Sequence, residues 1–320
     1  MLAHRALVAA AVFFTAGLAH AQDFPNRTIT LVVPYAAGGG LDATARLIAE
    51  PMGRALGQSV IVENRPGANG QVGVSSVAQA QPDGYTVLFS NGSPMTITPH
   101  LADITYDPIA DFEPITTLIT NDLLIAVTGD FPAQTYEEFE ELVRSEPGRY
   151  LYSSAGLGGE SHLAMELYQA ATGLEMRHVP FAGDGAAIPN VLNGDVPVMI
   201  TAYNSIQQYV AEGQIRPIVT LGSERMDRLP DTPTMVEEGE DSLVVGAWFG
   251  VYAPLGTDAE IVAALNAAFH AALEDPAVVQ RIDELGMRIS PSTPEELTQK
   301  LVDENARWEQ VIRDANITLE

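Results

Sequence analysis

The chain has 320 residues, and its 42 acidic against 16 basic side chains give a formal net charge of -26. An acidic surface of this kind argues against nucleic acid and anionic membranes as partners. The absence of cysteine excludes disulfide frameworks, zinc-thiolate sites and a cysteine nucleophile.

The first 21 residues have the features of an export signal. His4 and Arg5 precede an apolar run, Ala6 to Leu18, and Ala19-His20-Ala21 has the small-x-small pattern of a cleavage site. The run would form about 20 Å of helix, too short for a hydrocarbon core of about 30 Å. We therefore expect cleavage after Ala21 and an exported protein of 299 residues (320 minus 21).

Strand and helix patterns alternate in the first part of the mature chain. We expect a strand at Ile29–Val33, a helix at Asp42–Leu56 in which Pro51 limits the length, and a proline-rich linker from Thr98 to Pro114. Between them we expect strands at 60–63 and 86–90 and a helix at 70–80, and after the linker an apolar stretch at 115–119.

A second alternating series begins at Leu123–Val127. Thr135 with Glu138 three residues later has capping-box spacing and predicts a helix to Ser145. Further strands are expected at 150–153, 177–179, 196–201, 217–221 and 246–253, and helices at 160–171, 186–193, 206–212, 258–273 and 294–315.

The pattern predicts an α/β fold with mainly parallel sheets, organised as two lobes around a ligand cleft. We expect lobe I to comprise residues 22–122 and 232–320, and lobe II residues 123–231. The proline-rich crossings between the two series mark these boundaries.

The first strand leads into Pro34-Tyr35-Ala36-Ala37-Gly38-Gly39-Gly40-Leu41-Asp42 and then a helix. Glycine allows close approach of the backbone to a ligand, and the first helical N–H groups lack internal partners. The segment therefore predicts an anion site.

Two catalytic interpretations compete with simple binding. Gly38 to Ala43 fits the dinucleotide pattern G-x-G-x-x-A, and Glu63 follows about 20 residues later. Asp42, in the first turn where a pyrophosphate would lie, and the export signal both argue against an NAD-dependent oxidoreductase. A hydrolase lacks support because no G-x-S-x-G motif is present, and Ser161 and His162 are neighbours that diverge on a helix. We expect no enzymatic activity.

The histidines and acidic residues give no sign of a metal site. His100, His162, His178 and His270 are not paired at metal-ligand spacing. Together with the arguments against a dinucleotide, this leads us to expect neither metal nor cofactor.

A second loop of the same design strengthens the binding interpretation. Tyr152 to Leu163 again runs from a strand through glycines (Gly156, Gly158, Gly159) into a helix. Two such helix starts facing one cleft would hold a dianion without arginine. The alternative is that both loops are ordinary turns between strand and helix, with Asp42 and Ser161 as usual first-turn residues.

An ordered set of motifs resembles the substrate-binding proteins of tripartite tricarboxylate transporters, the Bug family, over nearly the whole mature chain. The motifs are Pro34 to Asp42 with Ala45-Arg46, Val62 to Ala68, Pro82 to Thr86, Tyr106-Asp107-Pro108, Ser154-Ala155-Gly156 with Ser161-His162-Leu163, and Trp248-Phe249-Gly250 with Ala253-Pro254.

The resemblance implies a two-lobed periplasmic binding protein of the Venus flytrap type, expected as a monomer, that closes on a small organic carboxylate and delivers it to a membrane permease. A ligand-presenting subunit of a sensor stays open as an alternative. The resemblance implies that loop backbone and ordered water hold the carboxylate. The matching positions are Tyr35, Ala37, Gly39, Asp42, Ser90, Asn91, Ser154, Gly156 and Ser161.

The chain departs from the family where the second lobe would cover the variable end of the ligand. Phe181-Ala182-Gly183 stands in place of the usual Tyr-Lys-Gly, and Thr201 in place of a frequent Asp. Thr201 argues against an amino acid ligand, whereas Asp184 keeps that question open. Diacids, triacids and aromatic acids all fit. We expect Asp42 to anchor its own helix start, because a carboxylate beside a bound carboxylate is unfavourable.

Overall fold

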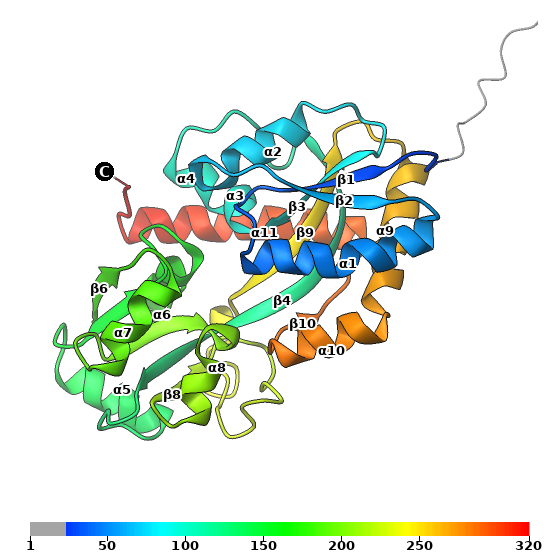
Figure 1. Ribbon diagram of the computed structural model, residues 1–320. Helices are drawn as coiled ribbons and strands as arrows, with labels where there is room; N and C mark the ends of the chain where they lie inside the picture. The colour runs from blue at the N-terminus through cyan, green and yellow to red at the C-terminus, as the bar shows by residue number, and fades with distance from the viewer. Residues whose placement is uncertain (1–23, 320) are drawn as a thin grey trace, which may run out of the picture.

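The computed structural model describes residues 24–319, so the expected signal peptide lies outside the described residues. Figure 1 shows two groups of elements joined by a long strand and flanked by a long helix. We call them the first and second lobe. No helix within the described part of the chain is long and apolar enough to cross a bilayer.

The first lobe has β1 (Ile29–Val33) between two parallel neighbours, β2 (Val60–Asn64) and β3 (Thr86–Asn91). Its helices and remaining strands are α1 (Gly40–Leu56), η1 (Ala68–Gly70), α2 (Gln71–Ala78), α3 (Ser93–Thr96), α4 (Thr98–Leu101), β9 (Gly246–Pro254), α9 (Ala259–Leu273), α10 (Pro276–Glu284) and β10 (Arg288–Ile289). Four of the five residues of β1 are buried, which matches a central strand covered on both faces.

The second lobe repeats this arrangement with β5 (Leu151–Ser154), which pairs in parallel with β6 (Arg177–Pro180) and β7 (Val198–Ala202). The other elements are α5 (Tyr136–Ser145), α6 (Glu160–Thr172), α7 (Asp184–Leu192), α8 (Tyr203–Ala211), β8 (Ile215–Thr220) and η2 (Asp241–Leu243). Thr135 caps α5 by accepting a hydrogen bond from Glu138 N, as the spacing predicts.

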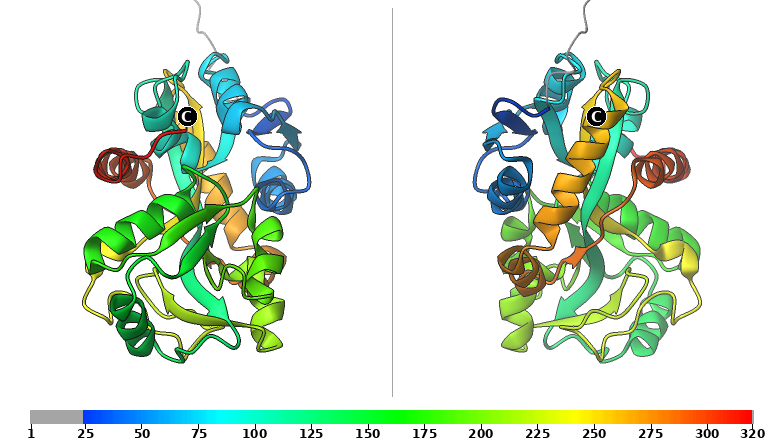
Figure 2. Two further views of the ribbon diagram at one scale, coloured as in Figure 1. Left: turned by 90° about the vertical axis from the view of Figure 1, so that its left-hand side faces the viewer. Right: turned by 90° about the vertical axis from the view of Figure 1, so that its right-hand side faces the viewer.

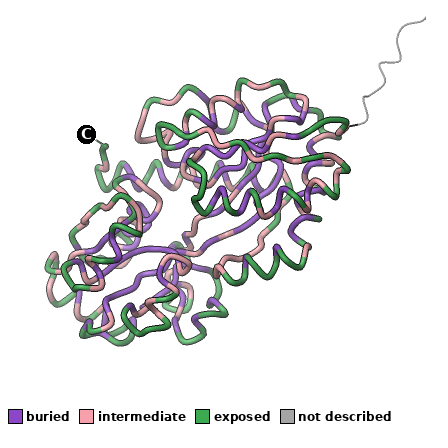
Figure 3. Tube along the Cα trace, viewed as in Figure 1, coloured by how far each residue is buried: buried purple, intermediate pink, exposed green. Residues whose placement is uncertain are grey.

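One strand, β4 (Phe112–Thr128), belongs to both lobes. Its first part pairs with β9 and β10 and its last part with β7 and β8, so a continuous sheet runs β2-β1-β3-β9-β4-β7-β5-β6. Figure 3 shows buried backbone following this central path. The sequence predicts a break between residues 119 and 123, and this is wrong: β9 stays paired with β4 as far as Asp122.

The prediction of mainly parallel sheets also needs correction. Strands β4 and β9 pair antiparallel with each other, β9 is antiparallel to β3, and β4 is antiparallel to β7 and β8. Only the three outer strands of each lobe are parallel. Strands β4 and β9 carry the chain from one lobe to the other in opposite directions, so they pair antiparallel. Parallel pairing would instead need a crossover connection such as a helix.

The last helix, α11 (Pro294–Asp314), contacts the cores of both lobes. Leu297 and Leu301 pack with residues of the first lobe, while Trp308, Val311 and Ile312 pack in the core of the second. Figure 2 shows α11 on one side of β4 and β9 and α1 on the other. The helix starts with a capping box between Thr293 and Glu296, which fixes its first turn.

The expected lobe boundaries stay a prediction. The packing of residues 235–245 indicates where the chain passes from the second lobe back into the first. Met235, Leu243 and Val245 are buried in the second core, and Met235 N donates to Thr220 O. This packing favours a return near Gly246, where β9 begins, rather than at residue 232. Helix α1 passes through Pro51 without ending there.

Candidate functional site

The two glycine-rich loops lie at the carboxyl ends of the parallel strands β1 and β5, where α/β proteins commonly bind ligands. Gly39 and Gly159 precede α1 and α6 with almost the same backbone angles, φ/ψ of -79/170° and -79/165°. Neither helix start has a side-chain cap among the described residues. The first intrahelical bonds are Ala43 N to Gly39 O and Leu163 N to Gly159 O.

Three N–H groups at each helix start are consequently left without an intrahelical acceptor. In α1 they belong to Gly40, Leu41 and Asp42, and in α6 to Glu160, Ser161 and His162. Because these groups carry the positive end of the helix dipole, each start is a candidate site for a carboxylate oxygen.

Side chains of the first lobe hold the first loop in shape. Asp42 is 4% exposed, and its Oδ2 accepts hydrogen bonds from Gly38 N at 2.9 Å and Arg46 Nε at 3.1 Å. Asn64 accepts from Arg46 and donates to Tyr35 O, and the Tyr35 hydroxyl donates to Asn91 Oδ1 at 2.9 Å. Asp42, Tyr35 and Asn91 therefore form one connected framework, in which Asp42 anchors its own loop and helix start.

The acidic residues at the two helix starts add little repulsion toward an anion. The Arg46 hydrogen bond is the main cause that lowers the pKa of Asp42, against the opposing effect of burial, and the charge of Asp42 is compensated by Arg46. The pKa of Glu160 is raised to about 8, chiefly by burial and also by Glu304 of α11, while Lys300 opposes this. At neutral pH the start of α6 is therefore mostly uncharged.

The second loop has its own framework, built from Ser154, Ser161 and His162. Ser154 is 1% exposed, and its Oγ lies 2.7 Å from His178 Nε2 and accepts from Gly156 N at 3.3 Å. Ser161 Oγ accepts from Ala155 N at 3.2 Å, and His162 Nδ1 accepts from Gly158 N at 3.1 Å.

The third segment, residues 181–184, lies beside the second loop, because Phe181 N donates to Ser154 O and Gly183 N to Ala155 O. Asp184 Oδ2 accepts hydrogen bonds from Thr201 Oγ1 at 2.8 Å and Ser205 Oγ at 2.6 Å. Asp184 is thus joined to Thr201 across 17 residues of sequence. The carboxylate of Asp184 therefore lies next to Thr201, the position at which the family resemblance predicts an Asp.

The remaining predicted residues, Ala37, Gly39 and Ser90, fall at the same end of the first lobe. Ala37 and Gly39 are exposed in the loop, whereas Ser90 is fully buried at the end of β3 and donates to Asn91 O. Burial is the main cause that raises the pKa of Tyr35; the Asn91 hydrogen bond lowers it, and Tyr106 and Glu160 raise it.

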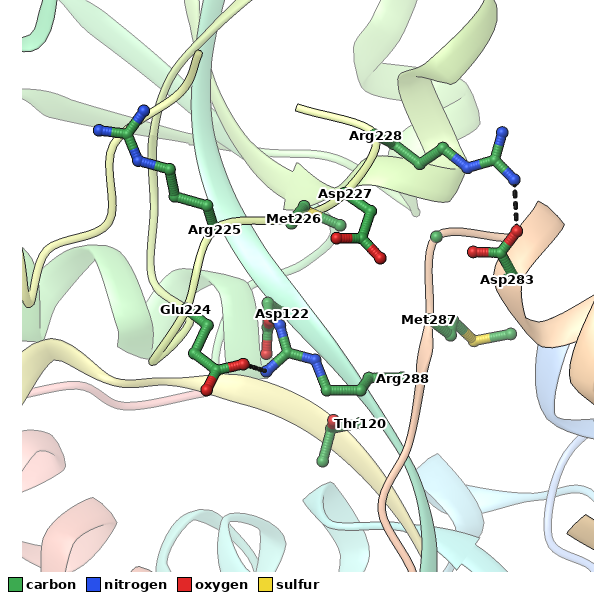
Figure 4. Close-up of a pocket in the computed structure, with 11 residues that line it drawn as sticks. Thr120, Asp122, Glu224, Arg225, Met226, Asp227, Arg228, Asp283, Met287 and Arg288 are labelled. Atoms are coloured by element: carbon green, nitrogen blue, oxygen red, sulfur yellow. Dashed lines mark hydrogen bonds and ion pairs between the residues drawn. The ribbon is translucent and has the colours of Figure 1, made fainter. Parts of the chain in front are cut away.

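A separate pocket of about 270 Å³ lies between the lobes beside β10 (Figure 4). Within residues 24–319 its lining includes none of the residues predicted to hold ligand. Its arginines are already paired: Arg228 with Asp283 at 2.6 Å, and Arg288 with Asp122 at 3.2 Å. This pocket therefore offers no excess positive charge to an anion.

Sequence reasoning missed His162 and His178 as parts of the site. Because Gly38 to Ala43 and Gly158 to Leu163 align residue by residue, His162 takes the place of Asp42, and this alignment was a usable signal. The described residues contain no group of three or more histidine or acidic side chains arranged to hold a metal ion.

Comparison with known proteins decides the family. Residues 44–317 match the model of the tripartite tricarboxylate transporter family receptor. The chain belongs to this family. BugT of Bordetella pertussis is 33% identical to the receptor over 313 residues, covering 95% of each chain. The predicted Bug-family membership is confirmed.

Solved structures confirm the two-lobed binding-protein fold. The periplasmic binding protein BugD has a TM-score of 0.74 at 33% identity, covering 92% of the receptor and 99% of BugD. MatC from Rhodopseudomonas palustris, solved with bound malate, has a TM-score of 0.74 at 35% identity, covering 90% and 100%. A second R. palustris protein, solved with adipate, has a TM-score of 0.78 at 32% identity, covering 92% and 99%.

Proposed function

We propose that the receptor captures a small organic carboxylate in the periplasm and delivers it to the permease subunits of a tripartite tricarboxylate transporter, acting as a monomer after cleavage at Ala21 and without catalysing a reaction. The observation that carries this proposal is the matched pair of uncapped helix starts, one in each lobe. The malate and adipate bound by related proteins support the same ligand class.

The energetics fit a ligand held mainly by backbone N–H groups. A micromolar affinity corresponds to about -8 kcal/mol, of which two helix termini supply only about 0.3–1 kcal/mol each. Three to five hydrogen bonds to a charged oxygen, at roughly 1.5–3 kcal/mol each, cover the remainder. The six free N–H groups of the two helix starts provide enough donors. Hence no arginine is needed at the ligand.

A thermal-shift panel tests this function. The panel contains dicarboxylates, tricarboxylates, aromatic acids, amino acids and NAD, applied to protein refolded from denaturant to remove carried ligand. At about 100 times its dissociation constant, a true ligand stabilises the protein by about 2.7 kcal/mol, a clearly measurable rise in Tm. A rise confined to one class of acids supports the proposal, whereas a rise with NAD alone contradicts it.

Gly39→Val separates site binding from nonspecific stabilisation. Gly39 has ordinary extended backbone angles, and a Cβ there would meet only Ala36 O, at 3.8 Å. The larger side chain therefore fits the loop but fills the space before the first helix start. We expect an unchanged Tm without ligand and loss of most of the ligand-induced rise. A full ligand response in this variant would place the bound acid elsewhere.

The second lobe is proposed to set selectivity through Phe181, Asp184 and Thr201. We expect Asp184→Asn to favour dicarboxylates over monocarboxylates by at least about fivefold, because a negative charge about 4 Å from the variable end costs about 1 kcal/mol even at the dielectric of bulk water. Asn can still accept from Thr201 and Ser205. Isothermal titration with matched pairs of acids measures the ratio. An unchanged ratio would show that the carboxylate of Asp184 does not face the ligand.

A further inference from the structure

The second loop is held by a titratable counterpart of Asp42. Gly38 N donates to Asp42 Oδ2 at 2.9 Å, and Gly158 N donates to His162 Nδ1 at 3.1 Å. Both acceptors are the third residue of their helix, and both glycines have positive φ, 90° and 68°. The two loops therefore share one anchoring hydrogen bond, made by a carboxylate in the first lobe and by an imidazole in the second.

We propose that His162, supported by His178, is the positioning residue of the second loop, and that protonation of His162 releases the loop in mildly acidic conditions. The effect of this release on ligand binding rests on the proposed function. The release itself follows from the loop geometry and does not depend on that function. A ring nitrogen that accepts from a backbone N–H carries no proton. Protonation at Nδ1 therefore removes the Gly158 anchor.

The stacking of His162 on His178 favours the neutral state of both rings. The rings of His162 and His178 are 3.9 Å apart and 12° from parallel, and the Tyr152 ring also stacks with His178, at 4.9 Å. His178 Nε2 lies 2.7 Å from Ser154 Oγ, so the two histidines hold the start and the middle of the same loop. Two imidazolium rings at this separation would repel each other.

Burial of both histidines also favours their neutral state, against the charge of Glu166. Burial lowers the pKa of His162, opposed by Glu166, whose Oε1 lies 3.7 Å from His162 Nε2. Burial followed by the neighbouring His162 lowers the pKa of His178 to about 4. Glu166 also accepts a hydrogen bond from the Tyr152 hydroxyl at 2.7 Å, so its charge is shared between two partners.

The other elements packed on α6 bring further charged groups. Helix α11 carries Lys300, Glu304 and Arg307; the first two act on Glu160, and Arg307 donates to Val244 O. The short helix η2 contributes Asp241, which is exposed, and β7 has no titratable side chain.

The sign of the pH dependence follows from the lowered pKa. A released loop lets the histidine protonate near its ordinary pKa of about 6.5, whereas the anchored loop resists protonation. The anchored state is therefore fully favoured above about pH 6.5 and loses stability as the pH falls below it. Asp42 keeps its charge throughout this range because its pKa lies below the ordinary value. Only the second loop is released.

Hydrogen exchange followed by mass spectrometry tests this without any ligand. After correction for intrinsic rates, exchange of the segment 155–160 in the wild-type protein should be at least about tenfold faster at pH 5 than at pH 7.5. His162→Asn places an amide oxygen where Nδ1 accepts, so its exchange should stay slow at both pH values. His162→Leu has no acceptor and should exchange fast at both.

The matched control is His270→Asn, which removes a histidine that contacts Thr116 and Ser292 in the first lobe. It should retain the wild-type pH response. The proposal is overturned if exchange of the wild-type loop does not depend on pH, or if the His162→Asn loop is as pH-sensitive as the wild-type loop. These two proteins decide the test even if His162→Leu does not fold.

Malate serves as the probe for the effect on binding. Its dissociation constant should rise with falling pH more in the wild-type protein than in His162→Asn, which experiences the same change in malate charge. A receptor that binds no malate leaves the exchange result intact, so failure of the proposed function and failure of this inference remain distinguishable.

Discussion

Trp308→Ala is expected to lower the free energy of unfolding by about 3–5 kcal/mol, the usual cost of removing a large aromatic side chain from a core. Trp308 is 1% exposed and is the largest contact of α11 with the second lobe core. Chemical denaturation followed by circular dichroism measures the change. A loss below about 1 kcal/mol would show that α11 does not stabilise the second lobe.

Two variants of the same helix make this test specific. Val302 is 43% exposed, so Val302→Ala should change the unfolding free energy by no more than about 0.5 kcal/mol. Trp308→Phe keeps most of the apolar volume and removes an indole N–H that is buried without a hydrogen-bond partner among the described residues. It should therefore cost far less than the alanine variant.

Asp42→Ala is expected to lower the unfolding free energy by about 2–3 kcal/mol and to weaken carboxylate binding, because it leaves Gly38 N without an acceptor and frees the first loop. Titration calorimetry with the acid identified in the panel measures the binding, and denaturation measures the stability. Asn at this position still accepts from Gly38 N, so Asp42→Asn should lie between wild type and Asp42→Ala in both measurements.

The pH dependence of this contribution has a defined sign. Since its partners lower the pKa of Asp42, its stabilisation is complete above the ordinary carboxyl pKa of about 3.9 and is lost as the pH falls through the lowered value. The stability difference between wild type and Asp42→Asn should thus shrink only in strong acid. If Asp42→Asn instead tightened binding by more than tenfold, about 1.4 kcal/mol, the carboxylate would face the ligand directly and the anchoring role would be wrong.

Local sequence signals were sufficient for the two loops and for most of the elements. The apolar run of Ile29–Val33 predicts β1, and the cap at Thr135 predicts the start of α5. Likewise, a glycine run between a strand and a helix marks both candidate anion sites. These signals depend on residues within one or two turns of each other, so no tertiary information is needed to recognise them.

The sequence did not predict that β4 and α11 extend through both lobes. The polar residues Thr120, Asn121 and Asp122 interrupt the apolar pattern and predict a break, yet pairing with β9 keeps β4 extended through them. Helix α11 shows one amphipathic pattern, and nothing along it indicates that its two halves pack against different lobes.

The sequence by itself determined the family, the α/β composition and the two glycine-rich loops, because glycine conformation, capping and hydrophobic period are properties of neighbouring residues. Only the tertiary structure decided that Asp184 joins Thr201, that His178 stacks on His162 beneath the second loop, and that Arg46 reaches Asn64. These contacts depend on strand order and helix placement, which bring together side chains that are distant in the sequence. That placement gives the anchor of the second loop its stacked histidine partner, which contributes to the expected response to pH.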